Sequence, residues 1–224
     1  MINNLVLFTV YFSILMQFLT GVVQLDGLFL ELPKEHLILK DVLKIETLVQ
    51  FVEGMFYVWL VFNFKNIKTM ASKRYYDWMI TTPAMLLATI IYMNYLSREN
   101  SENLSFLKFN IENKVNIIKI FISNALMLLF GYLGEINKIS MLKSVGIGTI
   151  FFLYTFYVIW NDYAQYSLTG QKLFIFLFIV WGLYAVAAVM TPKYKNIGYN
   201  LLDIVSKNFY GLYIYYIIKQ LSIR

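Results

Sequence analysis

Seven apolar runs, each 20 to 24 residues long and bounded by polar clusters, limit what this chain of 224 residues can fold into. Each run is long enough to cross a bilayer, which takes about 20 apolar residues in an α-helix. Hydrophobic residue types make up 59% of the chain and charged residues 14%, too few charges to cover a soluble domain. The sequence therefore predicts an all-α integral membrane protein. The expected spans are Asn4–Gln24, Lys40–Asn63, Lys73–Leu96, Lys114–Glu135, Ile139–Trp160, Gln171–Met190 and Tyr199–Leu221.

The same composition argues against other classes of protein. A soluble enzyme, a disordered chain and a nucleic-acid-binding module are all poor fits. The net charge of +6 comes mainly from lysines and arginines between the apolar runs, where anionic lipid headgroups are the ordinary partner. We therefore expect the lipid bilayer as a partner and no nucleic acid. With no cysteine and a single histidine, His36, the chain is not expected to hold a metal.

The segments between the runs are short, with two exceptions. Residues 25–39 mix apolar and charged side chains and are compatible with an interfacial helix. Residues 97–113 are polar and are expected to form an exposed loop. The first run has no basic residues before it and no small-residue cleavage site, which favours a first span over a signal peptide. We expect residues 1–224 to form a single domain.

Ionisable residues inside a span are costly in a bilayer and are informative for that reason. Asp203 and Lys207 are four residues apart and share one helical face, within reach of an ion pair. Arg74, Asp77 and Thr81 also share one face. The ionisable residues inside the expected spans are Glu46, Glu53, Asp77, Asp203 and Lys207.

Two interpretations of these charges are open. They can form a buried network that fixes helix packing. Alternatively, Lys207 can carry a Schiff base, because a desolvated lysine amine condenses with a carbonyl compound. In the second case Asp77 and Asp203 would supply the counter-charge, and Arg74 would keep both carboxylates ionised.

Three motifs resemble the signatures of the microbial rhodopsins. The ten residues from Arg74 to Pro83 read R-Y-Y-D-W-M-I-T-T-P and are similar to the family's third-helix motif R-Y-x-D-W-x-x-T-T-P. The stretch from Leu202 to Lys207 resembles the seventh-helix motif L-D-x-x-x-K, which bears the retinal lysine. Trp181 and Tyr184 match the sixth-helix motif W-x-x-Y. The resemblance implies a seven-transmembrane-helix bundle of the microbial rhodopsin type, with retinal as cofactor, all-trans in the dark.

The resemblance also implies a role for individual residues. Lys207 would hold retinal as a Schiff base, Asp77 would be the counterion and proton acceptor, and Asp203 a second counterion. Other positions would support the counterions, namely Arg74, Thr81 and Tyr57. The retinal pocket would be lined by Trp78, Thr82, Trp181, Tyr184, Asn124 and Met127.

The chain departs from the outward proton pumps of this family. Ala88 stands where they carry a proton-donating carboxyl group, and residues 191–200 contain no acid for proton release. Glu46 and Glu53 instead lie two turns apart on one face of the second span. With Ser13 and Asn208 at similar depth, these glutamates resemble the pore lining of channelrhodopsins and of viral rhodopsins described as light-gated cation channels.

Three functions therefore stay open, and none is an enzyme. The favoured one is a light-gated channel for monovalent cations or protons. The second is an outward proton pump in which Glu46 replaces the missing donor, and the third is a photosensor. The family's topology implies an outside N-terminus and a cytoplasmic C-terminus, and family analogy suggests a homo-oligomer. If the protein is viral, its location would be the host cell membrane.

Overall fold

The computed structural model describes residues 4–63, 66–98 and 104–223, and all regular structure in these ranges is helical. The predicted all-α architecture is confirmed. Within the described ranges, six helices are long and apolar enough to cross a membrane. They are α1 (Asn4–Phe29), α2 (Ile38–Asn63), α3 (Ile67–Leu96), α5 (Lys114–Glu135), α6 (Met141–Asp162) and α7 (Leu168–Ala188).

The seventh span is one long helix with an irregular turn in the middle. It consists of α8 (Pro192–Asp203), the π-helical turn η3 (Ile204–Asn208) and α9 (Phe209–Leu221), which follow one another directly. It begins at Pro192 rather than at Tyr199, because a proline suits the first turn of a helix even in a polar segment. Lys207 lies in the π-helical turn.

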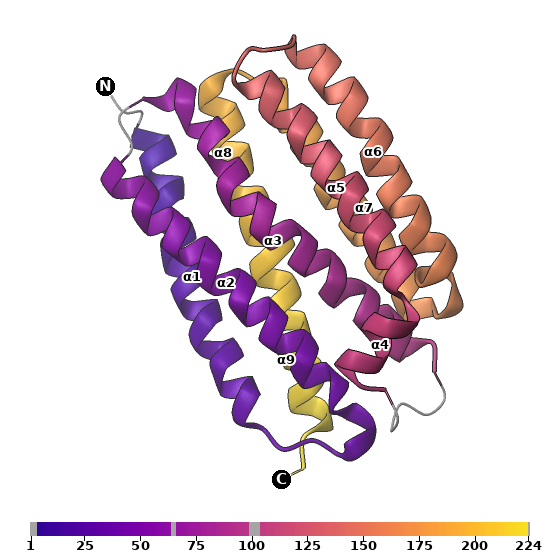
Figure 1. Cartoon of the computed structure of the whole chain (residues 1–224). Coiled ribbons are helices and arrows are strands. Elements are labelled where there is room, and N and C mark those ends of the chain that lie inside the picture. Colours follow the sequence, from indigo (N-terminus) through magenta and orange to yellow (C-terminus); the bar gives the residue numbers. More distant parts are fainter. Residues whose placement is uncertain (1–3, 64–65, 99–103, 224) are drawn as a thin grey trace.

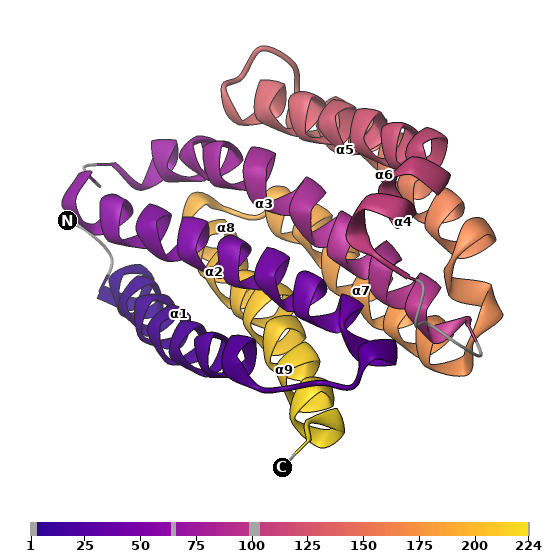
Figure 2. The same ribbon diagram turned by 60° about the horizontal axis from the view of Figure 1, so that its bottom comes forward.

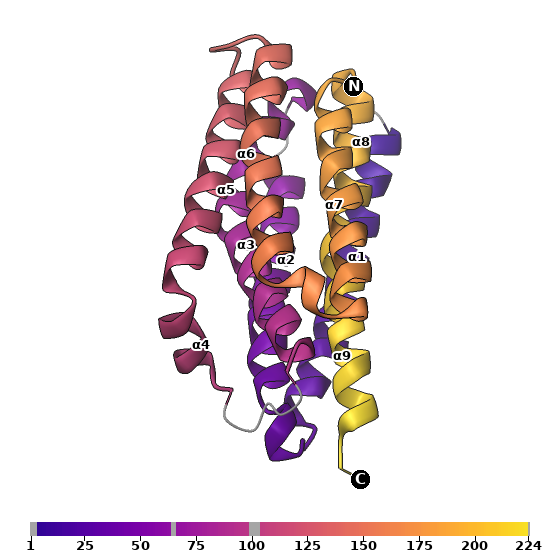
Figure 3. The ribbon, with the colours of Figure 1, turned by 90° about the vertical axis from the view of Figure 1, so that its right-hand side faces the viewer.

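The helices stand side by side as an elongated bundle (Figure 1). The start of α8 and the connection from α5 to α6 lie at one end, here called the α8 end. The short helix α4 (Phe106–Glu112) and the end of α9 lie at the other, here called the α4 end. Seen from the α4 end, α1, α2 and α9 are neighbours (Figure 2). Helices α5 and α6 pack closely on each other along one side (Figure 3).

Side-chain caps set the start of several helices. The Asn66 side chain accepts a hydrogen bond from the backbone of Lys68 (2.9 Å) and begins α3. Ser167 accepts one from Gly170 (2.9 Å) and begins α7. Asparagine and serine stabilise a helix start by satisfying an otherwise free backbone N–H.

The segment 25–39 does not form a separate interfacial helix, the possibility that its composition had left open. Helix α1 continues to Phe29, and a single 3-10 turn, η1 (Lys34–His36), precedes α2. The extension of α1 is held by a contact that sequence periodicity does not reveal, since Tyr215 on α9 donates a hydrogen bond to Asp26 (2.9 Å).

The expectation of an exposed loop over residues 97–113 was wrong for residues 106–112, whereas residues 99–103 lie outside the described ranges. Helix α4 forms within it, and the Ser105 side chain caps its start. Phe109 of α4 is fully buried and its ring contacts that of Tyr163. Burial of Phe109 therefore holds this short helix against the rest of the bundle. A search for apolar runs long enough to span a membrane does not detect such a contact.

Close packing of α5 against α6 gives a first testable prediction. A β-carbon at Gly134 would overlap the side chain of Ser144, whereas one at Gly146 would meet no atom within 4 Å. We expect Gly134→Ala to cost about 1–3 kcal/mol, because the helices must separate. Gly146→Ala, the matched control, should be neutral or stabilising by about 0.5–1 kcal/mol. Thermal inactivation rates of the purified protein measure both, and equal rates would contradict this account.

Candidate functional site

Three carboxyl groups surround the amine of Lys207 in the middle of the bundle. Lys207 Nζ lies 2.9 Å from Asp77 Oδ2, 3.3 Å from Glu53 Oε1 and 3.7 Å from Asp203 Oδ1. All four side chains are at most 3% exposed. The predicted cluster of Lys207, Asp77 and Asp203 thus exists, and Glu53 joins it. Sequence spacing predicts Glu53 near membrane mid-depth and close to Lys207, and the structure adds that the two form an ion pair.

Arg74 anchors the α8 side of this cluster. Its guanidinium is fully buried and donates to Asp203 Oδ2 and to the Tyr57 hydroxyl, both at 3.0 Å. It also donates to the side-chain oxygen of Asn200. Tyr57 donates to Asp203 Oδ2 (2.8 Å) and Tyr184 to Asp203 Oδ1 (2.8 Å). Both oxygens of Asp203 therefore accept hydrogen bonds, two at Oδ2 and one at Oδ1.

Thr81 and Asp77, the other residues predicted at the counterion site, differ in their hydrogen bonds. Thr81 is fully buried and its hydroxyl donates to the backbone oxygen of Asp77 (3.1 Å) rather than to the carboxylate. Asp77 Oδ1 has no hydrogen-bond partner among the described residues. Asp77 thus retains a free acceptor atom beside Lys207.

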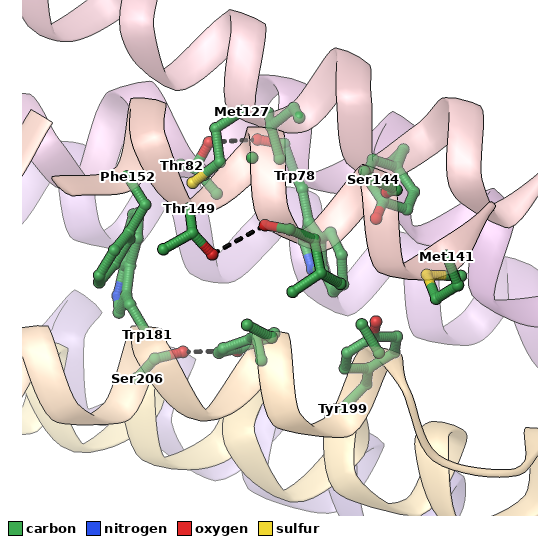
Figure 4. Close-up of a pocket in the computed structure, with 18 of the residues that line it drawn as sticks. Trp78, Thr82, Met127, Met141, Ser144, Thr149, Phe152, Trp181, Tyr199 and Ser206 are labelled. Atoms are coloured by element: carbon green, nitrogen blue, oxygen red, sulfur yellow. Dashed lines mark hydrogen bonds between the residues drawn. The ribbon is translucent and has the colours of Figure 1, made fainter. Parts of the chain in front are cut away.

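A largely apolar cavity reaches from Lys207 to the space between α3, α5, α6 and α7. It contains about 840 Å³ of space free of atoms, including its opening. Phe152 and Trp181 lie at one end and Met141 and Tyr199 at the other (Figure 4). Five of the predicted pocket residues line it, namely Trp78, Thr82, Met127, Trp181 and Tyr184.

Asn124 is the exception among the predicted pocket residues. It is not among the residues that line the cavity. Its amide instead donates to the hydroxyl of Thr82, which does line the cavity (2.8 Å). Tyr199 and Ser206 line the cavity but were missed. Tyr199 lies about two helical turns before Lys207, so the helical period places both residues on one face of the seventh span. The sequence therefore contained the signal that could have identified Tyr199.

A stripe of buried polar side chains runs along α1 on the other side of Lys207. Its members recur every three or four residues and therefore share one helical face. We call this the α1 stripe; it consists of Thr9, Ser13, Gln17, Thr20 and Gln24, all at most 6% exposed. Of these five residues, Ser13 is the one that the sequence predicts as part of an ion pathway.

The α1 stripe is hydrogen-bonded to the seventh span and to α2. Ser13 donates to the backbone oxygen of Asn200 (3.3 Å). Asn208 donates to Gln17 (3.3 Å) and to Thr20 (3.1 Å). Gln50 on α2 donates to the backbone of Gln17 (3.3 Å).

The four predicted ion-pathway residues thus lie around one polar region but do not form one cluster. Glu53 is paired with Lys207, whereas Ser13 and Asn208 have the α1 and α8 partners given above. Glu46 is 1% exposed, and neither of its carboxyl oxygens has a hydrogen-bond partner in the described ranges.

An ion pair joins two helices at the α8 end. Lys195 donates to both oxygens of Glu135, at 2.9 and 3.0 Å, and joins α8 to α5. Residues 191–200 contain no acid, as noted from the sequence, but the fold brings one from a different helix.

A family model described as bacteriorhodopsin-like protein matches residues 7–221. The chain belongs to this family. Its members are light-driven transporters or channels rather than enzymes, and they bind retinal. The prediction of a microbial rhodopsin, embedded in a lipid bilayer, is confirmed.

Individual relatives agree with this assignment. Viral rhodopsin OLPVRII has a solved structure with a TM-score of 0.82 and 25% identity, covering 99% of this chain and 100% of that one. The blue light-absorbing proteorhodopsin from Med12 gives a TM-score of 0.74 at 18% identity, covering 97% and 98%. The green-light absorbing proteorhodopsin of Gamma-proteobacterium EBAC31A08 is 25% identical over 160 residues, 63% of this rhodopsin and 59% of the relative.

The residues of the cavity fit retinal. Lys207 is the one amine among the lining residues, and aromatic and methionine side chains surround the space beside it. An apolar, aromatic lining suits a conjugated hydrocarbon chain. The buried carboxylates next to the amine suit a positively charged nitrogen.

Proposed function

We propose that this rhodopsin is a light-gated cation channel whose ions pass between α1, α2 and the helix formed by α8, η3 and α9. The α1 stripe supports this most strongly. Buried polar side chains are costly in a bilayer and mark pathways for ions or protons. The stripe extends over 16 residues, from Thr9 to Gln24, a rise of roughly 22 Å along the helix. That length suits a path better than an isolated site.

Light sensitivity is assigned to the cavity. Retinal bound covalently at Lys207 supplies the absorption of visible light and a change of shape. Trp78 and Trp181 would confine the chain of the cofactor, and Thr82 and Met127 would line its site. Tyr184 joins this pocket to the counterions through its hydrogen bond to Asp203.

Asp77 is assigned as the acceptor of the proton held at the Lys207 nitrogen. Its Oδ2 is the nearest carboxyl oxygen, at 2.9 Å, and its Oδ1 is free of partners among the described residues. Asp203 already accepts from Arg74, Tyr57 and Tyr184, and these donors and the Arg74 charge stabilise its ionised form. Asp203 therefore serves as the fixed counter-charge.

Glu53 links this proton transfer to the ion path. Its carboxyl group is held near Lys207 by charge, at 3.3 Å, with no hydrogen bond among the described residues. When the Lys207 nitrogen loses its proton, this attraction ends and Glu53 is released. Asn208 follows Lys207 in the π-helical turn, so a displacement there also strains its hydrogen bonds to Gln17 and Thr20. Separation of these groups opens the path.

The remaining assignments follow the family. The α8 end faces the outside and the α4 end the cytoplasm, with the C-terminus inside. Na⁺, K⁺ or protons pass down their gradients, and the protein forms a homo-oligomer. If the chain is viral, as the rhodopsin OLPVRII is, it acts in a host cell membrane.

One observation favours an outward proton pump as the second candidate. The buried, unpartnered carboxyl group of Glu46 lies on the α2 helix nearer the α4 end than Glu53. It can return a proton to Lys207 from the cytoplasmic side, a role that Ala88 on α3 cannot perform.

Voltage-clamp recording separates the two candidates. We expect the photocurrent to reverse sign as the membrane voltage is swept, and the reversal potential to follow the cation gradient. A channel conducts down the gradient, whereas a pump drives current in one direction. A current that keeps one direction at all voltages would refute the channel.

The same recording tests Glu53. We expect Glu53→Gln to reduce the photocurrent several-fold or to shift its reversal potential, because the variant keeps the shape but cannot carry the charge. Glu112→Gln is the matched control, since Glu112 is exposed on α4 and pairs at the surface with Arg98. Unchanged currents in Glu53→Gln would remove Glu53 from the path.

A further inference from the structure

Two buried polar side chains near the α4 end, Gln24 and Glu46, have functional groups without a hydrogen-bond partner among the described residues. A third buried polar side chain, Tyr210, lies beside them and has Thr89 as the hydrogen-bond neighbour of its hydroxyl. Gln24 is fully buried, and Glu46 and Tyr210 are each 1% exposed. Buried polar groups normally bind something, because burial without a partner costs about 1–3 kcal/mol each.

These three side chains come from α1, α2 and α9 and approach one another. Helices α1 and α2 pack antiparallel: Gln50 contacts Gln17, and a β-carbon on Gly27 would touch Leu43. This register places Gln24 level with Glu46. The amide nitrogen of Gln24 lies against Gly211, the residue after Tyr210, and Glu46 lies within electrostatic range of Tyr210. Figure 2 shows the three helices as neighbours.

The chemistry of these groups suits a small hard cation. A carboxylate, an amide oxygen and a phenol oxygen are oxygen ligands of the type that such cations prefer. Lys207 is paired with Asp77 at 2.9 Å and Arg74 with Asp203 at 3.0 Å, so neither of these buried cations is left to balance Glu46. A single carboxylate balances one positive charge, whereas a divalent ion would leave a net charge buried in the bundle, which is costly.

We propose that Gln24, Glu46 and Tyr210 bind a monovalent cation at the α4 end of the α1 stripe. The site rests on the proposed channel function, since it lies where ions would leave or enter the path. Its competitor is a proton on Glu46, which the pump would require. The two occupants predict different responses to the cations in the medium.

Infrared difference spectroscopy in the dark tests the site. The retinal-bound protein in lipid nanodiscs is perfused in turn with NaCl, KCl and N-methylglucamine chloride at one pH and ionic strength. We expect Na⁺ or K⁺ to shift a carboxylate band and an amide carbonyl band, with saturation. Glu46→Gln should abolish the carboxylate shift. Gln24→Leu and Tyr210→Phe should each weaken binding about tenfold, equivalent to about 1.4 kcal/mol.

Exposed residues give the controls. Glu112→Gln and Gln220→Leu make the same substitutions outside the bundle and should leave the cation titration unchanged. An unchanged visible absorption band shows that each variant is folded. Wild-type spectra that do not respond to Na⁺ or K⁺, or a shift that survives in Glu46→Gln, would overturn the site. These spectra are taken in the dark and do not depend on channel activity. A photocurrent that fails to reverse would therefore refute the channel function but would leave the cation-binding result unchanged.

Discussion

Lys207→Ala is expected to give a protein without visible absorption, because the substitution removes the one amine that lines the cavity. The unpigmented protein should also be less stable, since Asp77, Glu53 and Asp203 lose the ammonium group that lies 2.9 to 3.7 Å away. Removal of one partner from a buried ion pair costs about 3–5 kcal/mol. Absorption spectra with added retinal, and thermal unfolding without it, measure the two effects separately.

Lys219→Ala provides the matched control on the same helix. Lys219 is exposed at the end of α9, so its loss should alter neither colour nor stability. Borohydride reduction of pigmented wild-type protein, followed by peptide mass spectrometry, should place the cofactor on the peptide that contains Lys207. A coloured Lys207→Ala variant, or a label on another lysine, would refute the assignment of the attachment site.

Arg74→Gln should be the most destabilising substitution outside Lys207. The fully buried guanidinium contacts Asp203, Tyr57 and Asn200, and thus joins α2, α3 and α8. Glutamine cannot replace its charge, and Asp203 would remain as a buried carboxylate with less compensation. We expect a loss of about 3–5 kcal/mol, measured by denaturant unfolding in detergent or by the rate of thermal bleaching.

Arg98→Gln is the control for that loss. The side chain of Arg98 is 31% exposed and lies 3.5 Å from Glu112, a surface pair. Exposed pairs contribute about 0–1 kcal/mol. If both arginine variants unfolded alike, Arg74 would not hold the helices together as described.

Apolar periodicity predicted the helices better than their connections. The fourth expected span has the same first and last residues as α5. Polar residues on both sides of this apolar run mark where the helix begins and ends. The failures are α4 and the end of α1. The partner of Phe109 is Tyr163, directly after α6, and that of Asp26 is Tyr215 on α9; such contacts between distant segments leave no trace in local hydropathy.

The sequence by itself determined the membrane environment, the helices and the ionisable residues that meet at Lys207. Span length and the cost of burying charge in lipid do not depend on how the helices pack. The tertiary structure decided which other groups meet: the Asn124 amide donates to the Thr82 hydroxyl, and Glu135 pairs with Lys195. It also assembled the α1 stripe opposite Gln50 and Asn208. Helical period gives the face on which a residue lies, but the rotation and register of neighbouring helices decide what that face meets.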